Sequence, residues 1–451
     1  MPGSSSGEDS RSASAPPRAA PRPARRDGDA SVRFLILDLF TGMAGLCHAL
    51  ALLGVADDAE SLGIRVHMFE TDPDARKLLR AMETRWRLLS DAEDSAGLVG
   101  SVLALVENAF ALLSTIVAQY PNLVHVLVAG GSPCQGFSFA NPKAKGVKDP
   151  RSALIWVFHA IAWRLPGLLP PGATLALFLE NVRMHAVTRD SVSKLFGIEA
   201  REIDAELFGM CSRPRNFWNA YAVSDDPPPR TGSPGDVLEP GWRPLWELMP
   251  RGTPPASFRT FTRPFGPGAP PEYPVSFWKF SLATYDERGL VYRPDSEELP
   301  RIRDFVTRCM RCRTGPLRHG DSASVQLRGE VASWIHEHGG ASHLRPLSPD
   351  ERDRCLGFPA GASIVDSPPS GNPVDMVRAS LAGNAWAPPA AAFLLRPFAD
   401  AVRAGLAPPP RSVARPPAPR AARGPRRRPP SGPPGISACE SSARSASICS
   451  F

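Results

Sequence analysis

The stretch that decides the fold is Leu127-Val-Ala-Gly-Gly-Ser-Pro-Cys-Gln-Gly-Phe-Ser138, where an apolar run ends in two glycines and a cysteine follows closely. The run over residues 123–128, bounded by turn residues, predicts a buried parallel strand that feeds a tight loop. Ligands of open α/β sheets bind at the carboxyl ends of strands. We therefore expect Cys134, next to Pro133, at a functional edge. Taken alone, the stretch is equally compatible with a nucleophile and with a packed structural thiol.

The composition indicates a folded core with Pro- and Arg-rich tails. The chain has 451 residues, 43% of them hydrophobic, and a net charge of +7 that favours an anionic partner. Its 8 cysteines form no regular framework, which indicates a reducing compartment, and no apolar run is of membrane-spanning length or typical of a signal peptide. We expect a soluble intracellular protein with disordered tails at 1–31 and 406–451. The tails could carry a nuclear address, contact phosphates or simply be solvated.

Strand-like and helix-like segments alternate between the tails, which predicts a doubly wound, mainly parallel α/β sheet. The expected strands are 34–40, 66–70, 123–128 and 174–180, and the expected helices are 46–53, 72–86, 98–117 and 152–164. Residues 225–345 are rich in Pro and Gly and irregular in pattern, so we expect a second, smaller domain there. The predicted first domain covers 32–224 and is completed by 346–405, in which 381–403 is helix-like.

Polar residues follow several of these strands. Glu70 ends the second strand, where a carboxylate can bind the ribose hydroxyls of a nucleoside cofactor, although a helix-capping or surface acid is the alternative. Glu180 follows five apolar residues, and burying an acid is unfavourable by several kcal/mol unless it is paired or used. Arg213 and Arg215 are two apart on an expected strand, so both project from one face and could hold a phosphate or carboxylate.

Together these motifs resemble the cytosine-5 DNA methyltransferase family, in the family's order. The motifs are Asp38-Leu-Phe-Thr-Gly-Met-Ala-Gly45, Glu70, Gly131-Ser-Pro-Cys-Gln135, Glu180-Asn-Val182, Arg213-Pro-Arg215, Leu347-Ser-Pro-Asp-Glu351, Leu356-Gly-Phe-Pro359 and Leu381-Ala-Gly-Asn-Ala-Trp-Ala-Pro388. The segments Arg213-Pro-Arg-Asn-Phe-Trp218 and Phe258-Arg-Thr-Phe-Thr262, with Trp386, are similar to the de novo type of animal enzymes. The resemblance implies a Rossmann-like fold that binds S-adenosylmethionine and a small target-recognition domain at 225–345.

The resemblance also implies roles for individual residues. Cys134 adds as a thiolate to carbon 6 of cytosine, Glu180 acts at ring nitrogen 3, and Arg215, with Arg213 behind it, orients the base carbonyl and the acid. The target base must be flipped out of the stack. The implied cofactor-binding residues are Asp38, Phe40, Thr41, Gly42, Met43, Gly45, Glu70, Thr71, Ser101, Pro133, Asn384, Ala385 and Trp386. The implied DNA-binding residues are Gln135, Ser138, Lys143, Lys145, Arg151, Arg259 and Thr260, with Lys148 in the same loop.

Two features depart from the family pattern or add to it. The third strand of the family ends in an aspartate that holds adenine, whereas the best match here, over residues 99–102, offers Ser101; Asp91 and Asp94 are the alternatives. Cys309 and Cys312 could bind zinc with His319, His336 or His338, but a single Cys-x-x-Cys pair favours a surface turn with reduced thiols, so we expect no metal.

The sequence therefore predicts a nuclear DNA (cytosine-5-)-methyltransferase that uses S-adenosylmethionine, with homo- or hetero-oligomers left open and no membrane contact. One alternative is a transfer-RNA cytosine-5 methyltransferase, since a branch of the family modifies RNA, although the Cys-Phe-Thr element of that branch is not found here. The other alternative is an inert DNA-binding regulator with the same fold. The presence of Cys134, Glu180 and both arginines argues against that reading, while Ser101 argues weakly for it.

Overall fold

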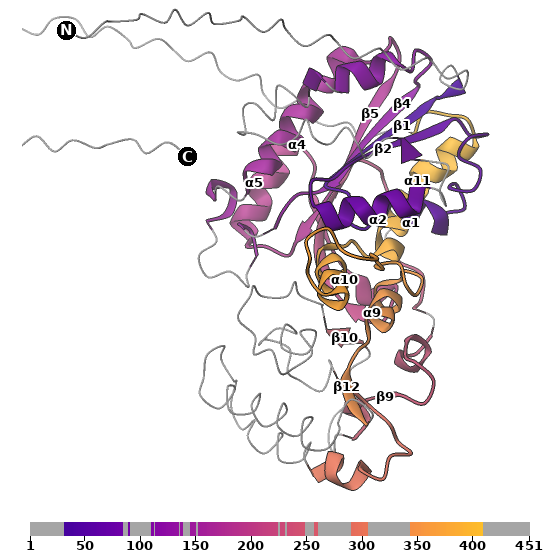
Figure 1. The fold of residues 1–451 in the computed structure, drawn as a ribbon. Coiled ribbons are helices and arrows are strands. Elements are labelled where there is room, and N and C mark those ends of the chain that lie inside the picture. The colour runs from indigo at the N-terminus through magenta and orange to yellow at the C-terminus, as the bar shows by residue number, and fades with distance from the viewer. Residues whose placement is uncertain are drawn as a thin grey trace, which may run out of the picture. The chain divides into compact units, whose positions relative to one another are not determined.

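The main feature of the computed structural model is a mixed sheet with seven described strands in the order β3-β2-β1-β4-β5-β8-β6 (Figure 1). The structure describes residues 31–83, 89–90, 110–111, 113–134, 136–138, 145–149, 152–223, 226–230, 232–248, 257–259, 290–304 and 343–408. The strands are β1 (Phe34–Leu39), β2 (Ile64–Phe69), β3 (Leu89–Ser90), β4 (His125–Gly131), β5 (Thr174–Val182), β6 (Ala200–Asp204) and β8 (Pro214–Asn219).

The direction of the strands confirms the predicted doubly wound fold. The strands β1 to β5 pair in parallel, whereas β8 is antiparallel to both of its neighbours, β5 and β6. All six residues of β1 are buried, as are the first six of β4. Strands covered on both faces read as continuous apolar runs, which is why these two were visible in the sequence. This sheet has the Rossmann-like arrangement expected of a methyltransferase.

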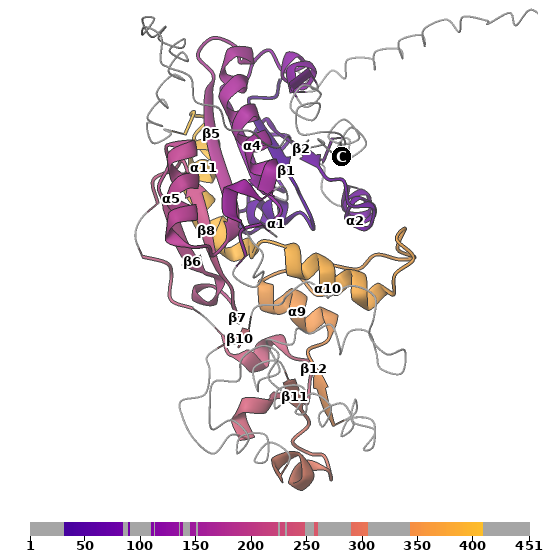
Figure 2. The same cartoon turned by 90° about the vertical axis from the view of Figure 1, so that its left-hand side faces the viewer.

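Helices cover both faces of the sheet. In Figures 1 and 2, α1, α2 and α11 lie on one face, and α4 and α5 lie on the other. Phe34 of β1 meets Phe398 of α11 edge-to-face, with ring centroids 6.5 Å apart, so the last helix packs against the first strand. The helices of this layer structure are α1 (Gly45–Leu52), α2 (Pro73–Glu83), α4 (Ala153–Arg164), α5 (Ala186–Phe196) and α11 (Pro388–Arg403).

The structure corrects three sequence-based expectations. The helix expected over 381–403 is two helices, α10 (Val374–Asn384) and α11, because Pro388 begins α11 and residues 385–387 separate the two. The strand β4 continues to Gly131, beyond the expected end at 128. A short strand, β3 (Leu89–Ser90), pairs with β2 where the sequence predicted none, and residues 99–102, the match to the family's third strand, lie outside the described residues. Only 110–111 and 113–118 of the helix expected at 98–117 are described, and they are helical.

The region between the sheet and α10 contains short strands with their own pairing. The strand β11 (Leu290–Tyr292) lies between β9 (Arg243–Pro244) and β12 (Leu344–Pro346), antiparallel to both. The strand β10 (Phe258–Arg259) pairs with β7 (Cys211–Ser212), which precedes β8 in the chain. The short 3-10 helices are η3 (Gly146–Lys148), η5 (Leu165–Leu168), η6 (Ala205–Leu207), η7 (Pro234–Val237) and η8 (Leu245–Leu248). The domain boundaries at 224, 345 and 405 stay predictions.

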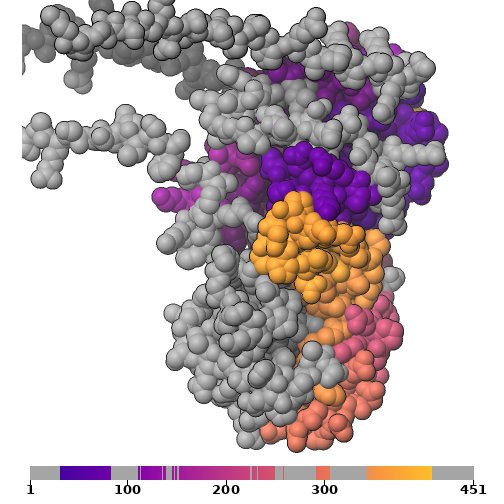
Figure 3. All heavy atoms as spheres, in the orientation of Figure 1, coloured from indigo at the N-terminus to yellow at the C-terminus, as the bar shows by residue number. Residues whose placement is uncertain are grey.

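The segment that returns to the sheet packs beside α2. It contains α9 (Pro349–Leu356), which begins with a capping box between Ser348 and Glu351. The loop after α9 meets α2 where Ser370 donates from its backbone N–H (3.0 Å) and its hydroxyl (2.6 Å) to the Asp74 carboxylate. Figure 3 shows this orange surface adjoining the indigo surface of α2. Among the described helices, none is long and apolar enough to cross a membrane.

Candidate active site

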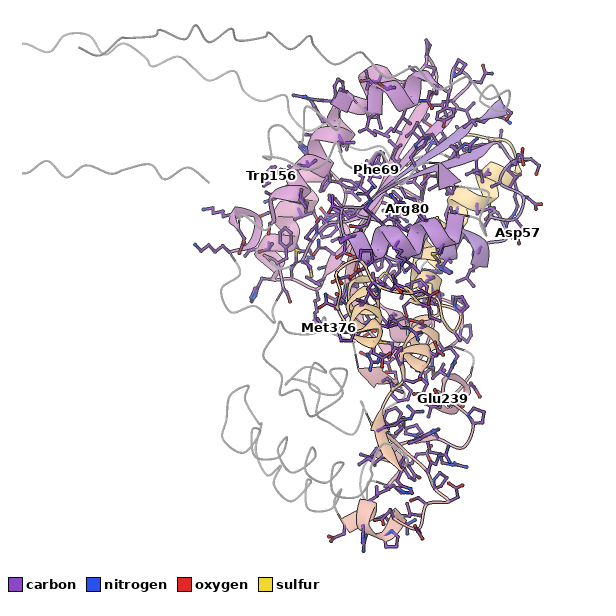
Figure 4. The ribbon with its side chains drawn as sticks, in the orientation of Figure 1. Asp57, Phe69, Arg80, Trp156, Glu239 and Met376 are labelled. Carbon is purple, nitrogen blue, oxygen red and sulfur yellow. The ribbon has the colours of Figure 1, made fainter. Side chains whose placement is uncertain are left out.

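A cavity of about 520 Å³ opens at the carboxyl ends of the parallel strands. Its walls come from the ends of β1, β2, β4 and β5, from the start of β8 and from one side of α10. Figure 4 labels Phe69, which lines the cavity at the end of β2, and Met376, which marks α10. The lining residues include Phe40, Gly42, Glu70, Thr71, Pro133, Cys134, Glu180, Arg213, Arg215 and Asn384. The cavity therefore joins all four predicted catalytic residues to half of the described cofactor-binding ones.

The strands β5 and β8 bring the acid and an arginine together. Their antiparallel register pairs Val182 with Arg215, so Arg215 lies diagonal to Glu180 on the same face. Arg215 Nε is 3.0 Å from Glu180 Oε1, and the side chains are only 13% and 10% exposed. The prediction that a buried acid at this strand end would be paired agrees with this geometry. Burial raises the pKa of Glu180 above its usual range, while the charges of Arg215 and Arg213 oppose the rise.

The loop that carries Cys134 is fixed from two sides. Asn181 Nδ2 donates to both the backbone oxygen and the hydroxyl of Ser132, each at 3.0 Å, which holds the residues before the cysteine. After the cysteine, its carbonyl accepts from the backbone N–H groups of Phe137 and Ser138 at 2.9 Å. A side chain at Gly136 would collide with the side chains of Ser152 and Asp149, so these side chains pack directly against the backbone of the loop.

The surroundings of Cys134 favour its protonated thiol form. Burial raises the pKa of Cys134 above 9.0, its ordinary value. The nearby charge of Arg215 lowers that pKa, Glu180 raises it, and Arg213 lowers it. Formation of the thiolate, which is the reactive form, therefore depends on the charges of Arg215, Glu180 and Arg213.

The cofactor side of the cavity is a tight turn after β1. Phe40, Gly42 and Ala44 have φ angles of 61°, 60° and 56°, the left-handed region that only glycine adopts readily. Two non-glycine residues in this region indicate a backbone held in shape by its surroundings, as is common at ligand sites. Phe40 and Gly42 line the cavity directly. Thr41 braces the turn, because its hydroxyl donates to Asp38 O at 2.8 Å and accepts from Phe69 N at 3.2 Å.

Glu70 is oriented by backbone N–H groups from two loops. Its Oε2 accepts from Gly42 at 2.8 Å, and its Oε1 accepts from Thr71 at 2.7 Å and from Asp72 at 2.9 Å. The carboxylate thus ties the end of β2 to the turn after β1 and still faces the cavity. Burial raises the pKa of Glu70 above its usual range, and these three N–H groups oppose the rise. A carboxylate, an aromatic ring and exposed backbone around one cavity fit a nucleoside ligand.

Half of the described cofactor candidates lie behind the cavity wall instead of lining it. Asp38, Met43 and Ala385 are buried in the core, and Thr41 acts as the brace described above. Gly45 and Trp386 meet each other: a Cβ at Gly45 would lie 3.0 Å from the Cβ of Trp386. The indole also covers Gly131, where a side chain would collide with it, and contacts Phe178 with centroids 5.3 Å apart. These residues shape the cavity from behind.

The predicted DNA-binding residues are described only in part. Ser138 is half-buried and Lys145 is exposed; the backbone N–H of Lys145 donates to Asp149 Oδ2 at 3.3 Å. Lys148 is exposed at the end of η3. For Arg259 the backbone is described, in β10, and its side chain is not. Gln135, Lys143, Arg151, Thr260 and Ser101 lie outside the described residues, as do Asp91, Asp94 and the cysteines and histidines of the zinc alternative.

Sequence reasoning missed two kinds of residue. Asn181 was quoted within a motif but given no role, although it holds the Ser132 backbone. Its position directly after Glu180, at the end of a predicted strand, was the signal that could have indicated this role. Leu381 of α10 was likewise quoted in a motif without a role and lines the cavity, and Asp74 lines it from α2, where no local pattern marked it. Within the part of the chain that the structure describes, no cluster of His, Cys, Asp and Glu could hold a metal ion.

Comparison with known proteins gives a family match for part of the chain. Residues 34–191 match the family model of the C-5 cytosine-specific DNA methylases. No curated protein sequence matches the chain significantly. One similar solved structure is the Dnmt2 methyltransferase of S. pombe, with 15% sequence identity and a TM-score of 0.43 over 81% of this chain and 97% of that chain.

Proposed function

We propose that this chain methylates carbon 5 of cytosine in DNA, and the match of residues 34–191 to the family model of the C-5 cytosine-specific DNA methylases supports this proposal. The family uses S-adenosylmethionine as the methyl donor, and the motifs predicted this cofactor. The observation that carries the proposal is the convergence of Cys134, Glu180 and Arg215 in one cavity with Phe40, Gly42 and Glu70. A thiol, an acid and a nucleoside-type pocket in one cavity are what covalent activation of a base next to a bound cofactor requires.

The proposed chemistry starts at the thiol. Carbon 5 of cytosine is a weak nucleophile, so the Cys134 thiolate adds to carbon 6 and the ring electrons become available at carbon 5. Negative charge then develops on the ring. Glu180, whose pKa is raised by burial, donates a hydrogen bond or a proton at ring nitrogen 3, and Arg215 stabilises the base carbonyl while holding Glu180 in place. Once carbon 5 has taken the methyl group, loss of its proton to a base and cleavage of the bond between carbon 6 and the Cys134 sulfur restore the aromatic ring.

The residues on the other side of the cavity fit the cofactor. The backbone at Gly42 allows close approach, Phe40 offers a ring face, and the Glu70 carboxylate faces the cavity from the end of β2. The bound cofactor supplies the methyl group. Asn384 of α10 faces the same space, and Pro133 and Thr71 complete the wall. These assignments cover the predicted cofactor residues that line the cavity.

We propose duplex DNA as the substrate, with a base flipped into the cavity. The motifs of the de novo type support this choice over RNA, and the excess of basic residues fits a nucleic-acid substrate of either kind. Lys145 and Lys148 are exposed in the segment after Cys134, where phosphate contacts would be expected. We also propose a nuclear location, which imaging of the tagged protein in its own cells would check. Oligomerisation is left to measurements of mass in solution.

A covalent trap tests the proposal. Purified protein is incubated with S-adenosylmethionine and duplex DNA that contains 5-fluorocytosine, which blocks loss of the carbon 5 substituent. The expected result is an adduct that survives denaturing electrophoresis in the wild type and is absent in Cys134→Ala. Transfer-RNA transcripts with the same modified base are run in parallel. An adduct with RNA alone would replace the DNA substrate with RNA, and no adduct with either, despite cofactor binding, would favour an inert DNA-binding regulator.

A further inference from the structure

Arg213 lies between the catalytic residues and the cofactor wall. Its side chain is fully within the protein, at 2% exposure, and its Nη2 donates to Gly383 O at 2.9 Å and to Ala385 O at 2.7 Å. These two carbonyls belong to the C-terminal end of α10, and the residue between them is Asn384, which lines the cavity. The end of a helix leaves carbonyls without intrahelical partners, and a cation there is favourable. Arg213 thus caps α10 from 170 residues away in the sequence.

The contacts of Arg213 hold the start of the short irregular segment, residues 385–387, that connects α10 to α11. The chain leaves α10 at Ala385, places Trp386 against Gly45 and Gly131, and begins α11 at Pro388. Asn384 therefore faces the cavity only if the α10 end stays in place. The backbone of Arg213 is itself fixed, because its N–H donates to Asp204 Oδ1 at 2.5 Å. A fixed arginine that holds two carbonyls in turn fixes the residue between them.

We propose that Arg213 is a positioning residue of the cofactor site, which holds Asn384 in the cavity wall, and not a residue that orients the base. The inference rests on the proposed function for the identity of the cofactor. The inference gives the two arginines of the Arg-Pro-Arg motif different roles. Arg215 pairs with Glu180 on the base side, whereas Arg213 reaches back to the cofactor side.

Cofactor binding in the absence of nucleic acid tests this division. The affinity of the full-length chain for S-adenosylmethionine is measured by calorimetry for the wild type, Arg213→Lys, Asn384→Ala and the double variant. The lysine keeps the charge, but its side chain is one bond shorter and cannot place a donor where Nη2 of Arg213 lies. Loss of a charge-assisted hydrogen bond corresponds to about a tenfold weaker affinity. We expect about tenfold weakening in each single variant and little further weakening in the double variant, because both changes disable the same contact.

Arg215→Lys is the matched control on the base side. It should bind the cofactor within about twofold of the wild type and yet lose methyl transfer. Arg213→Lys should regain much of its transfer rate when the cofactor is raised about tenfold, which a general loss of structure would not allow. An Arg213→Lys variant that binds S-adenosylmethionine as tightly as the wild type, or whose methyl-transfer rate is not restored by saturating cofactor, would overturn this inference and leave the proposed function standing. No binding to the wild type would overturn both the inference and the assigned cofactor.

Discussion

Removing the arginine of the buried ion pair gives the sharpest test of the site. The perturbation is Arg215→Met, which keeps the aliphatic length and leaves Glu180 without its partner. The two atoms of the pair are 3.0 Å apart, with side chains 13% and 10% exposed. Charge centres about 4 Å apart interact by about 4 kcal/mol at an effective dielectric constant near 20. Loss of one member of a buried pair destabilises proteins by about 3–5 kcal/mol, so we expect a loss of this size near neutral pH.

The pH dependence of the unfolding free energy tests whether Glu180 causes the destabilisation of Arg215→Met. Burial already raises the pKa of Glu180 in the wild type, and removal of the arginine raises it further. A group with a raised pKa in the folded state stabilises the protein below its unfolded pKa, near 4.5, and this stability is lost as the pH rises through the folded pKa. The destabilisation of Arg215→Met relative to the wild type should therefore grow from pH 5 to pH 8.

The control is Glu180→Gln, which removes the titrating acid. Its stability relative to the wild type should change in the opposite direction and improve as the pH rises, because only the wild type then bears a buried carboxylate. Urea unfolding, followed by intrinsic fluorescence at pH 5, 6, 7 and 8, gives both differences. Parallel changes in the two variants, or a loss below about 1 kcal/mol for Arg215→Met at pH 8, would contradict the buried pair. Both variants should also lose methyl transfer.

Three further predictions follow from the same geometry. The rate of Cys134 alkylation by iodoacetamide should rise with pH with a midpoint above pH 9.0, and Glu180→Gln should lower this midpoint, because removing the negative charge lowers the thiol pKa. An unchanged midpoint would show that Glu180 does not affect the thiol. Gly131→Ala should lower the free energy of unfolding by about 1–3 kcal/mol through collision with Trp386, whereas Gly167→Ala, which meets open space, should have little effect in the same urea titration. Burial lowers the pKa of His125 to about 4, so its neutral form stabilises the fold above pH 6.5 and this stability is lost as the pH falls. The difference in unfolding free energy between the wild type and His125→Asn should therefore shrink by about 2 kcal/mol from pH 7 to pH 5. A difference that stays constant over this range would contradict the prediction.

The sequence by itself determined the sheet and which candidate residues stand at the ends of its strands. Fully buried strands such as β1 and β4 appear as apolar runs with a turn behind them, so the positions of Cys134, Glu180 and Glu70 at strand ends could be read directly. Parallel strands bring their carboxyl ends to one edge, and that rule alone predicted that these residues would meet. The short strand β3 was not predicted, because two residues at the edge of a sheet leave too little pattern to detect.

The tertiary structure decided which neighbours each residue has. Trp386 was expected at the cofactor and is buried behind its wall, because glycines at positions 45 and 131 leave room for the indole there. Arg213 was expected beside the base and caps α10, which is distant in sequence. Such partners arise only when the last helices return to the first strands. Local periodicity specifies which face of an element is buried, and the packing of distant elements specifies what each side chain touches.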